Sequence, residues 1–435
     1  MKKSLKVIFI ICLILGVLAA GLNLYSASQM EHLQELEQQQ AARDKALATI
    51  KAAEYLGIDP DTVEVPDEVH ITGFDQFIIS LHNSSRMLWV LAVDLVIIGA
   101  GGLALAALRR RKRDAQGSKK LGSGNNIVGI LIALAALCLD LAIASPVFLT
   151  SSNFLNVFQQ ISINWVVAVG MTLVIISGGI DLSVGSNIAL TGLLMGILMK
   201  NYHVPVLVTV LGCIIFSGLV GLANGWLISF LNLPPFIATL GTMYIVRGGA
   251  YTVTNGQPIY TFPKGFTAIA GRMFGIPLYS ILIMFAVILV GWYVLKYTRI
   301  GRFTYAVGGN ENCARLSGIN IRKVKCFVYM FSGLCCGVAA LLLSSRLDSG
   351  LPTNADGQDW EMDAIAAVVI GGTSMSGGEG SMIGTLIGIL IIGIIANGLN
   401  LLGVAQGPQK MVKGLIIVVA VIIDVIRRKA SESAK

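Results

Sequence analysis

Two long apolar stretches of this chain are each interrupted by a glycine-rich segment. The first interruption, GGIDLSVG, occupies residues 178–185 within the apolar run 161–199. The second, GGTSMSGGEG, occupies residues 371–380 within the run 364–402. Both follow the pattern G-G-x-x-x-S-x-G, 193 residues apart. Paired interruptions at matching places in two halves indicate a transporter core built from an internal repeat. We call these segments the first hinge and the second hinge.

Composition places the two stretches in a membrane. The 435 residues are 55% hydrophobic and only 13% charged, whereas soluble domains carry about 25% charged residues. Lipid can take the place of a charged surface, so the composition predicts an all-α polytopic membrane protein. The net charge of +8 does not indicate a nucleic-acid partner, because the basic residues gather in short clusters at 2–6, 109–120, 296–325 and 427–435.

The four basic clusters predict the topology. Short loops rich in lysine and arginine stay in the cytoplasm, so an even number of crossings must separate any two clusters. Two crossings fit at 7–25 and 87–108, six between Lys120 and Lys296, and four between Lys325 and Arg427. The sequence therefore predicts about 12 transmembrane segments, 2 in an N-terminal extension and 10 in a two-repeat core, although the hinge-broken segments could also enter and return.

These crossings divide the chain into an N-terminal extension at 1–120, a transport core at 121–430 and a cytoplasmic tail at 431–435. The extension joins its two crossings by an acidic, extracytoplasmic segment at 26–86 and ends in a basic cytoplasmic linker. We expect the first crossing to be an uncleaved anchor. The segment 26–86 is interpreted as a spacer or cap, with a platform for an extracytoplasmic partner as the alternative.

Enzymatic motifs are missing from the sequence. It contains no G-x-x-x-x-G-K-[ST] phosphate loop and no H-E-x-x-H motif. Its seven cysteines have no metal-binding or redox spacing, and the core leaves no room for a soluble catalytic domain. We therefore predict that the chain is not an enzyme, with no catalytic residue, no metal and no cofactor, and that it does not hydrolyse ATP itself.

Asp181 is a carboxylate within the first hinge. An ionisable side chain in a membrane segment needs a partner or a function. Asp181 can cap the half-helix that begins beyond Leu182 and Ser183, because unwound backbone and a helix N-terminus offer N–H donors. A proton or cation site is the alternative interpretation.

The cytoplasmic loop 296–325 is predicted to hold a short helix. Asn310 can cap this helix, and Gly318 can end it. A small, partly apolar helix on the inner face suits a cleft in another protein, with a helix lying on the lipid surface as the alternative. The residues expected to make this contact are Glu311, Ala314, Arg315 and Gly318.

Four motifs of the core are specific in combination. They are GGIDLSVGS from residue 178, GGNExxARLSGI from residue 308, MDAIAA from residue 362 and GGTSMSGGEG from residue 371. Over about residues 126–427 the chain thereby resembles the permease subunit of bacterial ribose and simple-sugar ABC importers. The N-terminal extension departs from the usual shorter form, so the resemblance implies nothing about its role.

The resemblance implies ten helices per core, a homodimer, a separate cytoplasmic ATPase and an extracytoplasmic sugar-binding protein. It also implies a multi-pass location in the bacterial inner membrane, and it identifies the helix at 311–319 as the coupling helix that receives the motion of the ATPase. The expected cargo is ribose or another simple sugar. The alternatives are a branched-chain amino-acid or nucleoside ABC permease, and an ion-coupled secondary transporter that uses Asp181 and Asp363.

Whatever the cargo, we expect the translocation pathway to use the hinges and polar residues of the neighbouring helices. Any of the polar residues could equally form a helix–helix hydrogen bond. The candidates are Gly178, Gly179, Asp181, Ser183, Gly371, Gly372, Ser376, Asn164, Thr239 and Asn397.

Overall fold

The computed structural model describes residues 124–272, 276–354 and 359–432, together with residues 38, 39, 42, 43, 45 and 46. The expected crossings at 7–25 and 87–108, most of the acidic segment 26–86 and the basic linker at 109–120 lie outside the described residues.

The chain divides into two compact units. The larger unit comprises residues 120–139, 146–397 and 413–435, and it contains both hinges and the loop 296–325. The smaller unit comprises residues 1–119, 140–145 and 398–412. In the described part of the smaller unit, Gly398 packs against the side chain of Leu141, and the Gln409 amide donates a hydrogen bond to Asn400 Oδ1 over 2.8 Å.

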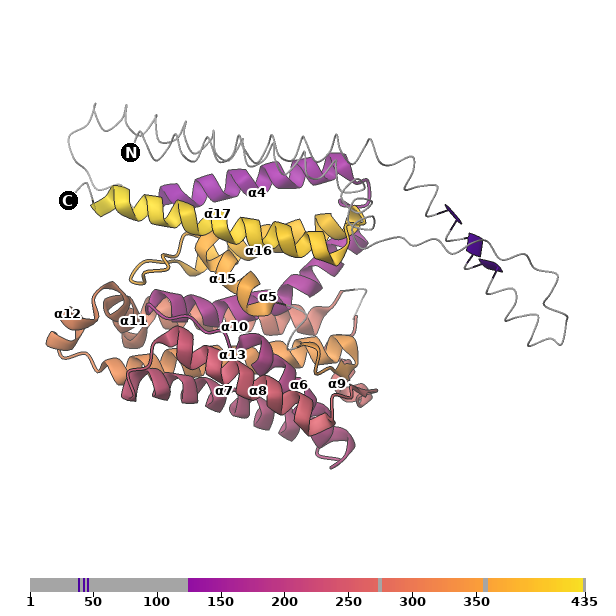
Figure 1. Cartoon of the computed structure of the whole chain (residues 1–435), viewed down its shortest axis with the longest axis horizontal. Coiled ribbons are helices and arrows are strands. Elements are labelled where there is room, and N and C mark those ends of the chain that lie inside the picture. The colour runs from indigo at the N-terminus through magenta and orange to yellow at the C-terminus, as the bar shows by residue number, and fades with distance from the viewer. Residues whose placement is uncertain are drawn as a thin grey trace. The chain divides into compact units, whose positions relative to one another are not determined.

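The described core is helical apart from one short pair of strands, which confirms the predicted all-α class (Figure 1). Strand β1 (Ile259–Tyr260) pairs antiparallel with β2 (Ser349–Gly350), with Ile259 opposite Gly350. The helices are α4 (Gly124–Ala144), α5 (Ser151–Ile176), α6 (Val184–Lys200), α7 (Val206–Phe230), α8 (Pro235–Thr254), α9 (Lys264–Thr267), α10 (Leu278–Tyr297), α11 (Arg299–Gly309), α12 (Glu311–Leu316), α13 (Ile321–Leu347), α15 (Trp360–Ile370), α16 (Met382–Leu401) and α17 (Gln406–Glu432).

Five of the described helices are long and apolar enough to cross a membrane: α5, α7, α10, α13 and α16. Helices α6 and α15 are shorter, with 17 and 11 residues, because the hinges cut the apolar runs at 161–199 and 364–402. The helices α4 to α8 and α10 fall in the interval where six segments are expected. Helices α13, α15, α16 and α17 fall where four are expected. The full count of twelve crossings remains a prediction.

Helices α7 and α13 pack closely because glycines face each other along their contact. A Cβ on Gly221 would collide with the Tyr329 carbonyl oxygen, and a Cβ on Gly225 would lie 2.6 Å from the Cys326 Cα. Across the same contact, Ser217 Oγ donates to the Gly333 carbonyl oxygen over 2.6 Å. Small residues that let backbones approach, with hydroxyls bonding across, are how helices associate without a hydrophobic driving force in lipid.

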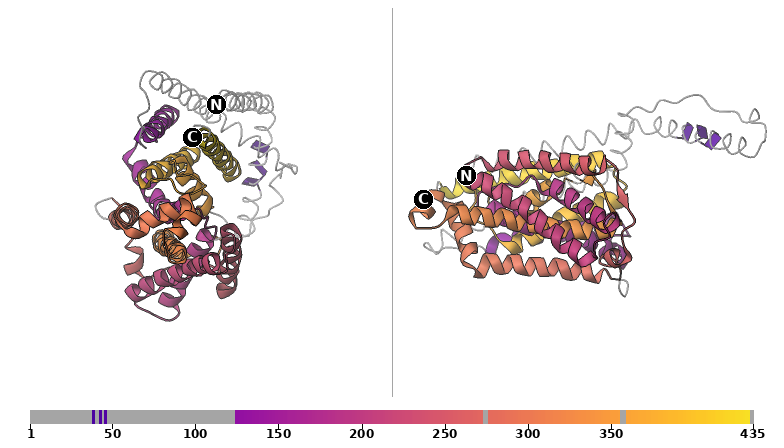
Figure 2. Two further views of the ribbon diagram at one scale, coloured as in Figure 1. Left: turned by 90° about the vertical axis from the view of Figure 1, so that its left-hand side faces the viewer. Right: turned by 90° about the horizontal axis from the view of Figure 1, so that it is seen from below.

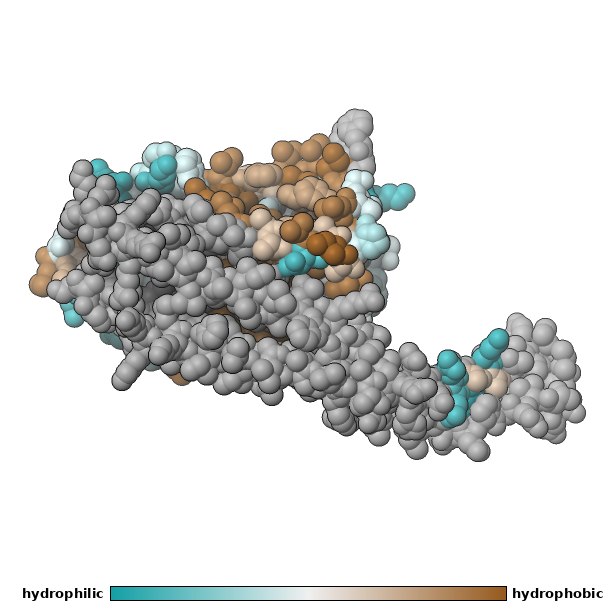
Figure 3. All heavy atoms as spheres, turned by 90° about the horizontal axis from the view of Figure 1, so that it is seen from above, coloured by the Kyte–Doolittle hydropathy of each residue, from teal (hydrophilic) through white to brown (hydrophobic). Residues whose placement is uncertain are grey.

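The larger unit forms a bundle around α5 and α13. Helices α5, α7, α8, α10 and α13 run roughly along one common direction, so that one view shows several of them end-on (Figure 2). On the face drawn in Figure 3, hydrophobic residues dominate the middle of the described surface, and hydrophilic ones gather mostly toward its ends. This distribution suits a helix bundle surrounded by lipid.

Candidate functional site

The first hinge separates α5 from α6 through an unwound segment at 177–183. Gly178 adopts a left-handed conformation with φ +80°, which a residue with a Cβ enters only with strain. The chain thus leaves the axis of α5 directly after Ser177. The Ser177 Oγ donates a hydrogen bond to the Val174 carbonyl oxygen in the last turn of α5, over 2.7 Å.

Asp181 stabilises the start of α6. Its Oδ1 accepts hydrogen bonds from Ser183 N over 3.1 Å and from Ser183 Oγ over 2.7 Å. Its Oδ2 accepts from Ser332 Oγ on α13 over 3.0 Å, and Asn224 Nδ2 on α7 donates to Ser183 Oγ over 2.9 Å. Within the described residues the carboxylate thus meets amide and hydroxyl donors, and these bonds tie the first hinge to α7 and α13. Ser183 is the N-cap residue of α6, and no side chain caps the first turn; Asp181 therefore fixes the residue that begins the helix, and its capping role stays a prediction.

The second hinge is a tight turn between α15 and α16. Gly372, Gly377 and Gly378 have φ values of +89°, +81° and +76°, so three of its glycines occupy the left-handed region. Gly371 lies against the backbone of Gly384, which lets α15 and α16 approach closely. Tyr305 on α11 holds the far end of the turn, because its hydroxyl donates to the Gly380 carbonyl oxygen over 3.0 Å. Burial raises the pKa of this phenol above its ordinary value.

The two hinges contact each other directly. The Gly378 N–H donates to the Ile176 carbonyl oxygen over 2.9 Å, and a Cβ on Gly377 would lie 2.9 Å from the Gly178 Cα. The end of α11 completes the contact, because a Cβ on Gly308 would collide with the Ile176 carbonyl oxygen and lie 2.7 Å from Gly378 N. We call this backbone-to-backbone contact of residues 176–178, 308–309 and 377–378 the glycine junction.

The predicted short helix in the cytoplasmic loop is α12. Asn310 Oδ1 accepts from Cys313 N over 2.9 Å, and Gly318, with φ +79°, follows its end, so the predicted cap and stop are confirmed. Ala314 is 5% exposed. It therefore packs inward, contrary to the expectation that it lies on the presented surface. Leu316 projects from α12, at 89% exposure.

One ion pair fastens α12 to the beginning of α13, and a second lies within α12. Lys325 Nζ lies 2.8 Å from Glu311 Oε2, and Arg315 Nη2 lies 3.6 Å from Glu311 Oε1. Glu311 follows Gly309 and Asn310 directly, so only two peptide bonds separate α12 from the glycine junction.

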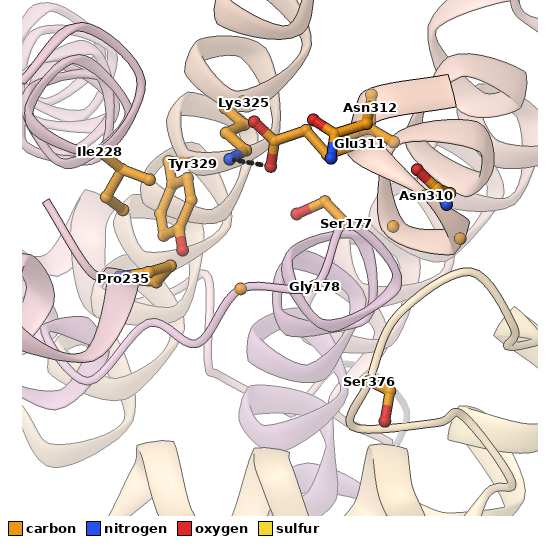
Figure 4. Close-up of a pocket in the computed structure, with 14 residues that line it drawn as sticks. Ser177, Gly178, Ile228, Pro235, Asn310, Glu311, Asn312, Lys325, Tyr329 and Ser376 are labelled. Atoms are coloured by element: carbon orange, nitrogen blue, oxygen red, sulfur yellow. Dashed lines mark hydrogen bonds and ion pairs between the residues drawn. The ribbon is translucent and has the colours of Figure 1, made fainter. Parts of the chain in front are cut away.

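A cavity of about 360 Å³ lies between the hinges and α12. In Figure 4, Lys325 and Glu311 meet above Ser177, Tyr329 and Pro235 lie to the left, and Ser376 lies at the lower right on the second hinge. The cavity is lined by Ser177, Gly178, Gly179, Ile228, Pro235, Val307, Gly308, Gly309, Asn310, Glu311, Asn312, Lys325, Tyr329 and Ser376.

The cavity brings together four of the residues predicted from the sequence: Gly178, Gly179, Glu311 and Ser376. Other polar candidates lie outside the lining of this cavity. Thr239 Oγ1 donates within α8 to the Pro235 carbonyl oxygen over 2.9 Å. Asn397 and Asn153 exchange two amide hydrogen bonds of 2.9 and 3.1 Å, and so connect α16 to α5.

Asn164 Oδ1 is buried without a hydrogen-bond partner among the described residues. Sequence reasoning did not assign a role to Gly308 and Gly309, although they precede the capping residue of α12. Within the described ranges, no group of three or more histidine, cysteine, aspartate or glutamate side chains is arranged to hold a metal ion.

Comparisons with known proteins all match permease components of transport systems. Residues 153–421 match the family described as branched-chain amino acid transport system / permease component. The chain is 45% identical over 302 residues to the ribose import permease protein RbsC of Escherichia coli (strain K12), covering 68% of this chain and 92% of the relative. It is 45% identical over 307 residues to RbsC of Bacillus subtilis (strain 168), covering 70% and 94%.

A third relative is the D-allose transport system permease protein AlsC of Escherichia coli (strain K12), 37% identical over 299 residues, covering 68% of this chain and 89% of the relative. No solved structure matches the chain.

Proposed function

The chain belongs to the family of ABC importer permeases that carry sugars, and from this premise we propose that its cargo is ribose or a closely similar simple sugar. The observation that carries the proposal is the 45% identity to ribose permeases of two distantly related bacteria. Identity to the allose permease is lower, at 37%. The alternative is a branched-chain amino-acid cargo, which the name of the matching family suggests, or a nucleoside.

A permease of this family is a multi-pass protein of the inner membrane, and it works with an ATPase subunit and a substrate-binding protein. We further propose that the permease forms a homodimer. Each subunit would have ten crossings in its core and two more in its N-terminal extension. The homodimer is supported by the family resemblance, and the ten crossings by the helices found between the basic clusters.

The coupling route runs from α12 through the glycine junction into both hinges. Leu316 and Arg315 extend outward from α12 and are available to a cleft in the ATPase. The Glu311–Lys325 ion pair attaches α12 to α13. A displacement of α12 by the ATPase would therefore move α12 and the beginning of α13 together. Because Gly308 touches the ends of both α5 and the second hinge, one displacement reaches the two halves of the core together.

The cargo and its energy source are tested by uptake into proteoliposomes. Vesicles would contain the permease, its ATPase and its sugar-binding protein, and radiolabelled ribose, allose and galactose would be compared. We expect saturable ribose uptake that needs ATP inside and persists when the proton gradient is collapsed. Uptake without the ATPase, or uptake abolished by the collapse, would contradict the proposal.

Contact of α12 with the ATPase predicts a large effect at Leu316. Replacing Leu316 by aspartate removes an exposed apolar side chain whose burial in a cleft is worth about 1.5–3 kcal/mol, which corresponds to about a tenfold to hundredfold weaker association. We expect the ATPase to be lost on purification and uptake to fall accordingly, with the thermal stability of the permease unchanged. Cys313→Ser, at an exposed position of the same helix, is the control. Normal ATPase association of L316D would place the contact elsewhere.

A further inference from the structure

The end of α10 that leads into α11 carries aromatic rings and cations side by side. Lys296 Nζ lies 4.8 Å from the centre of the Trp292 ring and 5.4 Å from the centre of the Tyr297 ring. Arg302 Nη1 donates a hydrogen bond to the Tyr297 carbonyl oxygen over 3.4 Å, so both cations lie against Tyr297. Arg299, the first residue of α11, is exposed like Lys296 and Arg302. We call these five residues the basic–aromatic patch.

The three cations of the patch lack a negative counter-charge in the part of the chain that the structure describes. None of them forms an ion pair with a described residue. Along the chain, no aspartate or glutamate occurs between Lys264 and Glu311, and Glu311 itself lies 2.8 Å from Lys325 Nζ. Cations gathered around one residue repel each other, so an anion from outside the chain would stabilise the patch.

The patch follows an apolar, membrane-spanning surface. Between Leu282 and Val290, every exposed side chain of α10 is apolar. The helix has 20 residues, which at 1.5 Å per residue extend about 30 Å, the thickness of the hydrocarbon layer. The end of α10 therefore reaches the level of the lipid headgroups, where aromatic side chains gather. The basic residues of the loop 296–325 indicate the leaflet that faces the cytoplasm.

A smaller group of similar chemistry occurs at the beginning of α13. There the guanidinium carbon of Arg322 lies 4.9 Å from the centre of the Phe230 ring. Three residues later, Lys325 already has Glu311 as its counter-charge. This group thus has a carboxylate at hand, whereas the basic–aromatic patch has none.

We propose that the basic–aromatic patch binds the headgroup of an anionic phospholipid, and that this lipid fixes the beginning of α11. Arginine donates paired N–H bonds to phosphate oxygens, lysine binds phosphate as a point charge, and anionic lipids attract basic residues next to membrane helices. The acyl chains would lie along the apolar side chains of α10. Helix α11 begins in the patch and ends at Gly308 and Gly309 of the glycine junction, so a lipid held at its first turn restrains the junction at its last.

Lipid retention by the purified permease tests the site. The protein in neutral detergent would be titrated with phosphatidylglycerol or phosphatidylcholine, and bound lipid would be measured by native mass spectrometry. We expect the wild type to prefer phosphatidylglycerol, and Lys296→Gln with Arg302→Gln to bind it about thirtyfold more weakly, since each cation contributes about fivefold. The control is Lys264→Gln with Arg272→Gln, which removes the same charge from exposed positions between α8 and α10. Equal losses in both variants, or no preference in the wild type, would overturn the proposal.

Uptake tests the effect of the lipid on α11. The permease, ATPase and binding protein would be reconstituted in phosphatidylcholine vesicles with and without phosphatidylglycerol. We expect the wild type to import ribose several-fold faster with phosphatidylglycerol, and Lys296→Gln with Arg302→Gln to be equally slow in both. Equal wild-type uptake in the two vesicles would contradict the role at α11, and loss of ATPase association by the variant in lipid-free detergent would identify an ATPase contact instead. Absence of ribose uptake in all vesicles would refute the proposed function, because lipid retention does not depend on the cargo.

Discussion

Uptake is expected to fall by about tenfold to a hundredfold when Gly308 is replaced by alanine. The added methyl group would collide with the Ile176 carbonyl oxygen and lie 2.7 Å from Gly378 N, and both neighbours are backbone atoms that no rotamer change can move. Overpacking of this kind typically costs about 1–3 kcal/mol, and each 1.4 kcal/mol is a factor of about ten in an equilibrium. The measurement is ATP-driven uptake in reconstituted vesicles.

Gly309→Ala is the matched control, one residue further along α11. There the new Cβ would lie 3.9 Å from the Gly378 Cα, which is an ordinary van der Waals contact. We expect this variant to transport within about twofold of the wild type. If Gly308→Ala also transports normally, or if it fails only because the protein no longer accumulates in the membrane, the glycine junction has no part in coupling.

Replacing Lys413 by methionine is expected to destabilise the permease by about 3–5 kcal/mol, because it leaves the buried carboxylate of Asp363 without its partner. Lys413 Nζ lies 2.9 Å from Asp363 Oδ2, and the exposed fractions of the two side chains are 23% and 9%. The ion pair joins α15 to the beginning of α17. The measurement is thermal unfolding of the purified protein in detergent.

The double variant Asp363→Asn with Lys413→Met isolates the cause. With the carboxylate removed as well, most of the lost stability should return, because the penalty arises from the unpaired charge rather than from lost packing. A double variant as unstable as Lys413→Met alone would assign the effect to the lysine's packing. The ion pair also bears on the ion-coupled alternative, since an aspartate that is already paired with lysine is poorly placed to bind a transported cation.

Much of the local structure could be predicted from the sequence. The glycine pairs at 178–179 and 371–372 mark the ends of α5 and α15, and Asn310 caps α12 as its type and position predict. These features depend on residues that are near neighbours in the chain. Backbone freedom at glycine and side-chain capping act within one or two turns, so a local pattern is sufficient to identify them.

Contacts between distant segments could not be predicted in the same way. The repeat offset shows that the two hinges are equivalent, but it does not show that they touch, and nothing in the sequence placed Gly308 between them. Polar residues were ambiguous for a related reason. Thr239 and Asn397 turned out to bond to helix backbone and to another asparagine, because spacing alone does not determine which side of a helix meets a neighbour.

Arg247 was missed although a signal existed. A single arginine in a long stretch without other basic residues is unusual in a membrane segment. Its guanidinium carbon lies 5.7 Å from the centre of the Tyr244 ring, three residues earlier on the same helix.

The two halves of the core are joined backbone to backbone at opposite ends of the bundle. At one end the Gly378 N–H bonds to the Ile176 carbonyl oxygen. At the other, β1 after α8 pairs with β2 after α13, and Phe262 N donates to Asp348 Oδ1 over 2.7 Å. Sliding one half along the other would break all of these bonds. Between the two attachments, the close packing of α7 against α13 at Gly221 and Gly225 adds a third restraint, so relative motion of the two halves must also repack this glycine contact.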